Sequence, residues 1–301
     1  MKILLTGATG FLGSHIAENL LAYNFELILT KRENSSLSNC QSFISNVKWV
    51  DTDSDSWIES VIEFNPTIII HAAWNGVSSS SRDDWKNQLS NIDFMYSLLK
   101  IAESCKINKF ISLGSQAEYG QIEGKITEDY PVNPTSSYGA VKLATLELLK
   151  SFCTDKNIDW YWLRVFSVFG ERENERWLIP SMIKKMLSES TEMDFTLGEQ
   201  KYAYLYVADF SAAIKKVVLN KAPSGIYNLS ADNALCLKDV LIMIRDMVKP
   251  SFILNFGTLP YRPNQSMLIE GDASKFNQTF GTIDASDFSI KLEQVVNSYR
   301  K

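Results

Sequence analysis

A glycine-rich turn directly after the first apolar run is the feature that most restricts the fold of this chain. The run KILLT at residues 2–6 leads into GATGFLG, which places glycines at positions 7, 10 and 13. Gly7 permits a tight strand-to-helix turn, Gly10 lets a pyrophosphate approach the backbone, and Gly13 lets helix and strand pack closely. The spacing differs from GxGxxG, but its place after a strand predicts a dinucleotide-binding unit with the phosphates at the helix N-terminus.

The first half of the chain continues this alternation of strands and helices. Further apolar runs are ELILT, VKWVD, TIIIHAA, KFISLGS and DWYWLRV, and patterns of helical period occupy residues 11–22, about 83–104 and about 137–156. Runs that are apolar on both faces and are separated by helices predict a parallel sheet covered on both sides. We therefore predict an α/β fold with a doubly wound, Rossmann-type parallel sheet in residues 1–170.

Residues 171–301 have a different character. Short apolar runs (FTL, YLYV, IYNLS, FILNF) alternate with loops that contain most of the prolines, and helical patterns occupy about 176–187, 209–219, 237–248 and 288–300. Asp209 is predicted to cap the second of these helices. We predict a smaller, mixed α/β substrate domain, some segments of which pack back on the first domain. A ligand would then bind between the two, at the carboxyl ends of the parallel strands.

Composition excludes several classes of function. The net charge is −5 with a pI near 5.3 and no basic block, which argues against nucleic acid as a partner. No stretch approaches the roughly 18 apolar residues of a membrane helix, so no membrane association is expected. The four cysteines are scattered without a CxxC pair and the chain has two histidines. This pattern predicts reduced thiols, a cytoplasmic protein and no metal site.

The end of the second strand bears on the choice of dinucleotide. A site for NAD usually has an acidic residue there, which accepts hydrogen bonds from the ribose hydroxyls. Here the strand ends LTKREN, so Lys31 and Arg32 occupy the place and can attract a 2′-phosphate. We predict NADP as the cofactor, with NAD still possible. Asp51, after the third strand, is predicted to lie near the adenine.

Four motifs together resemble one superfamily. GATGFLG, HAA at 71–73, GSQAEYG at 114–120 and YGAVK at 138–142 occur in the order found in the extended short-chain dehydrogenases/reductases. This group contains nucleotide-sugar epimerases, dehydratases and ketoreductases, and the similarity covers essentially the whole chain.

The resemblance implies a catalytic set of Ser115, Tyr138 and Lys142. Tyr138 and Lys142 are four residues apart, which places both side chains on one face of a helix. In the family the lysine contacts the nicotinamide ribose and favours the ionised phenol, and the tyrosine exchanges a proton with a sugar oxygen while hydride moves at the adjacent carbon. Ser115 matches the serine or threonine that hydrogen-bonds the same oxygen. Asn91 matches an asparagine that helps to hold the active site.

The resemblance also implies the residues that line the cofactor. They are Gly7, Thr9, Gly10, Phe11, Leu12, Gly13, Lys31, Arg32, Asp51, His71, Ala72, Ala73, Asn91, Leu113, Tyr138, Lys142, Phe166 and Ser167. His71 is interpreted as a residue of the core or of the cofactor pocket, not as a catalytic group.

Departures from the family pattern restrict the reaction. The 4,6-dehydratases carry an Asp–Glu pair after the catalytic serine or threonine, whereas this chain has Gln116 and Ala117. The epimerase–reductases that make GDP-fucose use a cysteine and a later histidine, whereas Ala117 and GERENE stand here. Hydride transfer at C4 of the sugar remains, as a 4-ketoreductase or as a 4-epimerase that retains NAD. Lys31 and Arg32 favour the reductase with NADPH.

The second half resembles the sugar-binding part of bacterial CDP- and dTDP-sugar reductases. GEQKYAYLYVAD at 198–209 and YRPNQSMLIEGDASK at 261–275 carry this similarity, although Tyr202-Ala203 replaces the Arg-Asp or Trp-Asp of many relatives. The implied partner is a nucleotide-diphosphate sugar, with Arg262 on its diphosphate and Trp74, Ser115 and Gln116 as further substrate contacts. A homodimer through the helices at 83–104 and 137–156 is expected by analogy. The alternatives are a non-catalytic, NADP-binding sensor or scaffold and a reductase of small ketones or aldehydes without a nucleotide.

Overall fold

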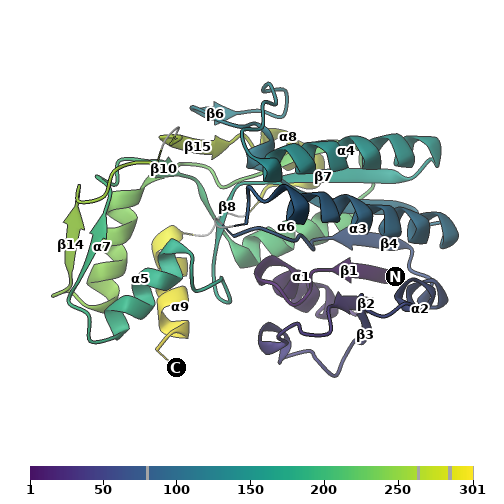
Figure 1. Cartoon of the computed structure of the whole chain (residues 1–301), viewed down its shortest axis with the longest axis horizontal. Coiled ribbons are helices and arrows are strands. Elements are labelled where there is room, and N and C mark those ends of the chain that lie inside the picture. Colours follow the sequence, from purple (N-terminus) through teal and green to yellow (C-terminus); the bar gives the residue numbers. More distant parts are fainter. Residues whose placement is uncertain (79–80, 263–264, 284–286, 301) are drawn as a thin grey trace.

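The chain forms a larger part built around one sheet and a smaller part that carries the C-terminus (Figure 1). A computed structural model describes residues 1–78, 81–262, 265–283 and 287–300. Pro263 and Asn264 of the YRPNQ motif therefore lie outside the described residues. Within the described residues, no helix combines the length and the apolar character needed to cross a membrane.

The larger part contains a seven-stranded sheet in which every neighbouring pair is parallel. Its spatial order is β12-β7-β5-β4-β1-β2-β3. This confirms the prediction of a doubly wound parallel sheet. The strands are β1 (Lys2–Thr6), β2 (Glu26–Lys31), β3 (Lys48–Asp51), β4 (Ile68–His71), β5 (Lys109–Ser115), β7 (Asp159–Val165) and β12 (Gly225–Leu229).

Both faces of this sheet are covered by helices, as the apolar runs predict. Successive residues of β1 point to opposite faces: Ile3 and Leu5 belong to one core cluster, and Leu4 belongs to another. The first cluster includes residues of α1 (Phe11–Leu21), α6 (Val207–Leu219) and α8 (Ser274–Phe280). The second includes residues of α2 (Trp57–Phe64), α3 (Trp85–Ser104) and α4 (Ser137–Asp155).

A buried lysine fixes α6 to the sheet. Lys109 at the start of β5 donates from Nζ to the carbonyl oxygens of Val217, Val218 and Asn220, at 2.7, 2.9 and 2.8 Å. A cation at the C-terminus of a helix satisfies carbonyls that have no partner in the helix and complements the helix dipole. Burial lowers the pKa of this lysine.

The start of α6 corrects one prediction. The helix begins at Val207 with Tyr206 as its N-cap residue and without a side-chain cap, so Asp209 lies inside the first turn. The prediction that Asp209 caps the helix was wrong. A carboxylate in the first turn is still favoured, because it faces the positive end of the helix dipole.

The smaller part has its own core and is built from short elements. Its core lies among α5, α7 and α9, and Figure 1 shows these helices beside β14, away from the large sheet. The segments are α5 (Leu178–Leu187), α7 (Leu237–Val248), α9 (Phe288–Ser298), the pair β9 (Glu192–Phe195) and β14 (Ile253–Phe256), the pair β8 (Ser167–Phe169) and β11 (Tyr204–Tyr206), and a four-stranded sheet of β13 (Leu235–Cys236), β10 (Lys201–Tyr202), β15 (Leu268–Gly271) and β6 (Lys125–Ile126).

The chain crosses between the two parts more than once. β6 from the first half pairs with β15 of the second half, while β12 and α6 from the second half pack in the larger part. The division into residues 1–170 and 171–301 stays a prediction about folding units. Two short 3-10 helices complete the fold, η1 (Ser38–Cys40) and η2 (Gln116–Glu118).

Candidate functional site

The reversal of strand order between β1 and β4 marks the place where a doubly wound sheet binds its ligand. The glycine-rich turn lies at this end of β1. Gly7 has φ +76°, and a Cβ there would meet the backbone of Ala72 and Ala73 at 2.6–2.8 Å. A Cβ on Gly13 would lie 2.1 Å from the Gly7 carbonyl oxygen. Both glycines are therefore required by close approach of the backbone.

The start of α1 fits a pyrophosphate. Its N-cap residue is Gly10, and no side chain caps the helix. An added Cβ on Gly10 would meet only the Gly7 carbonyl oxygen, at 3.4 Å, so the turn has an open outer surface. The first backbone N–H groups of a helix need acceptors, and a phosphate supplies both the acceptors and the negative charge. Thr9, Phe11 and Leu12 adjoin this surface and would hold the dinucleotide with the glycines.

At the predicted ribose end, two neighbouring strands bring opposite charges together. Lys31 Nζ lies 3.2 Å from Asp51 Oδ2, and the two residues are partners in the register of β2 and β3. A hydrogen bond from the Asp53 N–H, with help from Lys31, lowers the pKa of Asp51. Arg32 forms no ion pair within the described part of the chain. The charge of Lys31 is thus partly balanced, and Arg32 is the freer cation.

The end of β4 forms the wall opposite the glycine turn. His71 is buried, and its Nδ1 lies 2.9 Å from Thr6 Oγ1. Thr6 Oγ1 also accepts from the N–H of Ala73, and its carbonyl accepts from Ala72. Burial, with the nearby charge of Lys142, lowers the pKa of His71 to about 3. This histidine is therefore neutral near pH 7, in agreement with a core or cofactor-lining role.

Ser115 is held by a buried polar network. Its N–H donates to Glu118 Oε1 at 2.7 Å, and its Oγ accepts from Ala117 N–H at 3.2 Å, so Ser115 and Glu118 form a capping box around η2. The Glu118 carboxylate also accepts from Trp162 Nε1 and pairs with Arg164 Nε at 2.7 Å. Glu118 and Arg164 are 0% and 2% exposed. We call residues 115–120 the Ser115 segment.

Tyr138 and Lys142 lie together on the first turns of α4, both buried. Lys142 Nζ donates to the Leu113 carbonyl oxygen at 2.6 Å and lies 3.5 Å from the ring centroid of Trp74 and 6.0 Å from that of Tyr138. Burial lowers the pKa of Lys142 to about 7, the charge of Glu118 opposes this shift, and the charge of Arg82 adds to it. A phenol beside an ammonium group is suited to proton transfer.

The Ser115 segment contacts α4 at the same turn. A Cβ on Gly139 would lie 2.4 Å from the Ala117 carbonyl oxygen, so the glycine after Tyr138 allows this approach. Gln116 and Ala117 are half-buried there. The structure therefore brings three of the predicted regions together: the end of β5 with Ser115, the end of β4 with Trp74, and the start of α4.

A residue that the sequence analysis missed covers Tyr138. The guanidinium carbon of Arg82 lies 4.4 Å from the centroid of the Tyr138 ring. The Arg82 carbonyl oxygen accepts from the N–H of Tyr138 at 3.0 Å and from Ser137 Oγ at 2.8 Å. We call residues 74–78 and 81–84, between β4 and α3, the Arg82 segment.

Two amide side chains of α3 hold the Arg82 segment. Asn91 accepts from the Asn75 N–H at 2.7 Å and donates to the Asn75 carbonyl at 3.1 Å. Gln88 donates to the carbonyls of Gly76 and Ser81 and accepts from Trp74 Nε1 at 2.9 Å. Both polar atoms of Asn91 are thus occupied within the protein. This supports the predicted holding role, and direct contact with the dinucleotide stays a prediction.

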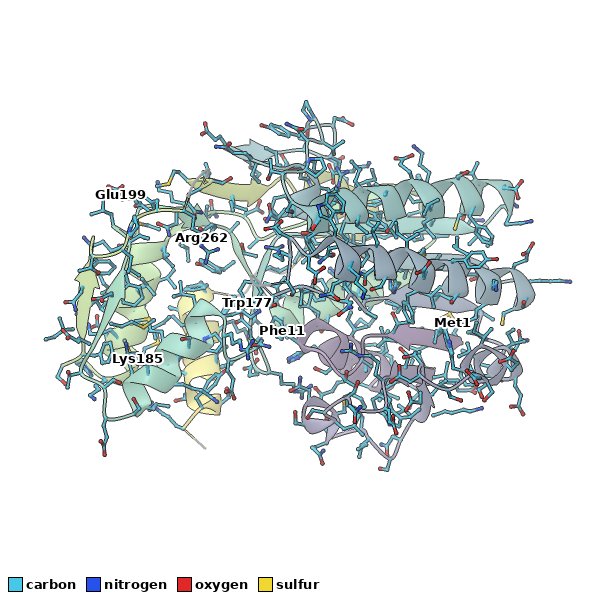
Figure 2. All side chains as sticks on the ribbon, viewed as in Figure 1. Met1, Phe11, Trp177, Lys185, Glu199 and Arg262 are labelled. Carbon is cyan, nitrogen blue, oxygen red and sulfur yellow. The ribbon has the colours of Figure 1, made fainter. Side chains whose placement is uncertain are left out.

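The remaining predicted residues are spread more widely. The ring of Phe166 packs in a small core with Tyr119 and Ile122, and Ser167 begins β8. Arg262 is exposed, and Figure 2 shows its side chain on the inner side of the smaller part, toward Trp177 and Phe11. Tyr202, which stands where the resemblance leads one to expect arginine or tryptophan, accepts from Gln265 Nε2 at 3.1 Å.

The missed residues had unequal signals in the sequence. Glu118 stands three residues after Ser115, which is the spacing of a capping box and could have revealed it. Arg82 stands in the polar run SSSSRDD, which has no periodicity that points to a site. Within the described ranges, no cluster of three or more His, Cys, Asp or Glu side chains could hold a metal ion.

Comparison with known proteins agrees with this geometry. Residues 3–230 match the model of the NAD dependent epimerase/dehydratase family. The chain is 30% identical to an uncharacterized UDP-glucose epimerase of Bacillus subtilis, YtcB, over 85% of each chain. It is 27% identical to a CDP-abequose synthase of Salmonella muenchen, over 88% of this chain and 87% of the other.

The fold has solved counterparts. The UDP-glucuronic acid 4-epimerase of Bacillus cereus, in complex with UDP-glucuronic acid and NAD, superposes with a TM-score of 0.89 at 24% identity, over 100% of this chain and 99% of the other. This similarity shows the fold alone. The match to the family model and the 30% identical relative show the family. The chain belongs to the NAD-dependent epimerase/dehydratase family, within the extended short-chain dehydrogenases/reductases.

Proposed function

We propose that this protein is an NADPH-dependent reductase that acts on the C4 carbonyl of a nucleotide-diphosphate sugar. The observation that carries the proposal is the buried pair at the start of α4, in which the Lys142 ammonium lies beside the ring of Tyr138 and beside that of the half-buried Trp74. Burial of an ammonium group costs free energy, and buried titratable groups of this kind are concentrated at functional sites.

The residues support a simple proton and hydride transfer. NADPH, when bound, supplies hydride to the C4 carbon of the sugar. Tyr138 gives its phenolic proton to the carbonyl oxygen, so that C=O becomes CH–OH and the dinucleotide is left as NADP⁺. Ser115 Oγ donates a hydrogen bond to the same oxygen, and Lys142 stabilises the phenolate until solvent returns the proton.

The preference for NADP is part of this proposal. Arg32 has no carboxylate partner within the described residues, and Lys31 shares its charge with Asp51. A 2′-phosphate would give both cations an anion, with the planar guanidinium able to bind two oxygens. Relatives solved with NAD, such as the Bacillus cereus epimerase, show that this fold accepts the other dinucleotide.

The proposed substrate rests on Arg262 and on the relatives. Arg262 faces the larger part in Figure 2 and is exposed, as a diphosphate ligand requires. A CDP-abequose synthase is among the relatives, which favours a 4-keto-6-deoxy sugar. Names of other relatives, such as the UDP-glucose 4-epimerase of Corynebacterium glutamicum, 26% identical over 82% of this chain, favour the second candidate, a 4-epimerase that retains NAD.

A homodimer in the cytoplasm completes the proposal. The outer faces of α3 and α4 expose Tyr96 and Leu148 around one groove, and α3 also exposes Leu89. Two copies could bury these side chains against each other. Sedimentation at micromolar concentration tests this, since a monomer would refute it. All four cysteines are free thiols, which suits a reducing compartment.

The decisive experiment mixes the purified protein with NADPH or NADH and a nucleotide-diphosphate 4-keto-6-deoxy sugar. We expect NADPH to be consumed faster than NADH. Tyr138→Phe should abolish turnover and spare NADPH binding. Tyr23→Phe, which changes an exposed tyrosine just after the C-terminal end of α1, should leave turnover unchanged.

Three outcomes would overturn the reductase. Interconversion of 4-hydroxyl epimers with firmly held NAD would establish the epimerase. Binding of NADP without turnover of any nucleotide sugar would favour a sensor or scaffold. Equal activity on small ketones that lack a nucleotide would leave Arg262 without its proposed role.

A further inference from the structure

Arg82 lies against the proposed proton donor and has no assigned role. Its guanidinium carbon is 4.4 Å from the centroid of the Tyr138 ring, which is closer than the 6.0 Å of the Lys142 ammonium. A cation at this distance from a phenol is within the roughly 8 Å over which salt leaves charges unscreened. The guanidinium of Arg82 therefore acts on Tyr138 in addition to Lys142.

The position of Arg82 is fixed by the backbone on both sides. Its own carbonyl oxygen accepts from Tyr138 N–H and from Ser137 Oγ, which ties residue 82 to the first turn of α4. The preceding residue, Ser81, accepts at its carbonyl from the buried Gln88. These hydrogen bonds hold the backbone of Arg82 beside Tyr138.

The guanidinium has no anionic partner in the protein. Within the part of the chain that the structure describes, Arg82 forms no ion pair, and its buried Nε has no hydrogen-bond acceptor. Asp84, two residues on, instead caps α3 by accepting from Asn87. An arginine that only stabilised the loop would be expected to pair with such a carboxylate, because an unpaired donor of a charged group is costly.

The charged groups around Tyr138 leave this cation unbalanced. On α4 the neighbour is Lys142, whose pKa burial lowers to about 7, so it carries only part of its charge near pH 7. On η2 the nearest carboxylate, Glu118, is paired with Arg164 of β7. On β4, His71 is neutral near pH 7. On the same segment as Arg82, Asp83 and Asp84 are exposed to solvent.

We propose that Arg82 is a positioning residue of this site, which acts through Tyr138 by stabilising its ionised phenol from the ring face. The proposal rests on the proposed function of Tyr138 as proton donor. A guanidinium over an aromatic face is attracted by the ring, and it is attracted more strongly when the phenol carries a negative charge. Arg82 would thus bind the phenolate that remains after proton transfer, together with Lys142.

A measurement without substrate tests the inference directly. Near-ultraviolet absorbance of the full chain is titrated with alkali, and the same titration of Tyr138→Phe is subtracted, so that the difference reports the Tyr138 phenol alone. We expect Arg82→Gln to move this ionisation to higher pH by about one pH unit, since a charge at 4–6 Å has at least this effect. Arg82→Lys, which keeps the cation, should restore most of the wild-type curve.

Arg245→Gln is the matched control. Arg245 lies on α7 in the smaller part and pairs with Asp246, so the same loss of one cation should leave the Tyr138 curve in place. Should Arg82→Gln fail to fold, Arg82→Met keeps the aliphatic stem on the ring and replaces it in the comparison. Coincident curves for wild type and either variant would overturn the inference.

Turnover separates this inference from the proposed function. In the NADPH assay, loss of Arg82 should lower kcat and change the KM for the sugar little. The loss of activity at alkaline pH should occur at a higher pH than in the wild type. If Tyr138→Phe turned over normally, the proposed function would fail. If Tyr138→Phe were inactive but Arg82→Gln lost its activity at the same alkaline pH as the wild type, only the role of Arg82 would fail.

Discussion

Two segments pack against the first turn of α4, and they differ in whether their buried charged group has a partner of opposite charge. In the Ser115 segment, the carboxylate of Glu118 has four short contacts, with the Ser115 N–H, Trp162 and Arg164, and all of its charge is balanced inside the protein. In the Arg82 segment, neutral amides of Gln88 and Asn91 hold the backbone, while the one cation stays without a carboxylate among the described residues.

This difference suggests that one charged group stabilises the fold and that the other acts on Tyr138. A fully paired buried network gives one rigid arrangement, and the Glu118 carboxylate at its centre has no capacity left for a ligand. A segment held by neutral amides can keep an unpaired cation available, because nothing nearby neutralises it. Mutation of Glu118 is therefore expected to act mainly on stability, and mutation of Arg82 mainly on the chemistry of Tyr138.

The largest effect is expected from Glu118→Gln. The substitution leaves the Arg164 guanidinium buried without a counter-charge, and breaking one partner of a buried ion pair typically costs about 3–5 kcal/mol. Urea unfolding followed by circular dichroism measures the loss in free energy of unfolding.

An exposed pair provides the control for Glu118. Glu147 and Lys150 on the outer face of α4 are 3.4 Å apart and 61% and 51% exposed. Glu147→Gln makes the same chemical change where water screens the charge, so it should cost far less. Equal losses in the two variants would contradict the view that the Glu118 network supports the fold.

A smaller effect is expected from Gln88→Leu, which keeps the volume of the side chain but removes its polar atoms. The carbonyls of Gly76 and Ser81 and the indole N–H of Trp74 then lose their partner, which should cost about 1–3 kcal/mol. Hydrogen exchange should also become faster at the amides of residues 74–78.

Gln294→Leu is the matched substitution on an exposed face of α9, where, among the described residues, the amide has a hydrogen bond with Lys291 only. It should change neither stability nor exchange in residues 74–78. If Gln88→Leu lowered stability but left exchange in that segment unchanged, the amide would not be what holds it.

How far the sequence predicts this molecule depends on the kind of signal each residue leaves. The strands of the large sheet are apolar on both faces, and the glycines at 7 and 13 are required by the turn, so both could be predicted. α2 follows the polar run DTDSDS and is only eight residues long, and the strand β6 has two residues, so neither leaves a strong periodic pattern.

In the site, too, the residues that belong to a sequence motif could be predicted and the others could not. Tyr138, Lys142 and Ser115 belong to motifs whose spacing carries the chemistry, and the structure brings their segments together. The ion pair of Lys31 with Asp51 depends on the register of β2 and β3, and the position of Arg82 depends on how a loop folds onto α4. Contacts between residues 20 or 56 positions apart are set by tertiary packing, which single-sequence patterns do not encode.

The last effect depends on pH and concerns Lys142, which lies between the two segments. Because burial lowers its pKa from 10.5 to about 7, the unfolded chain holds a proton that the folded chain has lost between these two values. Stability rises with pH wherever the unfolded state binds more protons. This group should therefore make the free energy of unfolding of the wild type increase above pH 7, by at most about 1.4 kcal/mol per pH unit.

Lys142→Met removes this contribution while keeping most of the side-chain volume. Unfolding by urea at several values between pH 7 and pH 9 should show a shallower rise of stability with pH for the variant than for the wild type, since every other titrating group is shared.

The charges of the two segments also predict how two further substitutions change the slope of stability against pH. Arg82→Gln removes a cation that opposes the ammonium and should reduce the slope, whereas a neutral residue at Glu118 removes a charge that supports it and should steepen the slope. Parallel curves for the wild type and Lys142→Met would mean that the buried ammonium keeps its proton through this range, and that the two segments do not act on it in opposite directions.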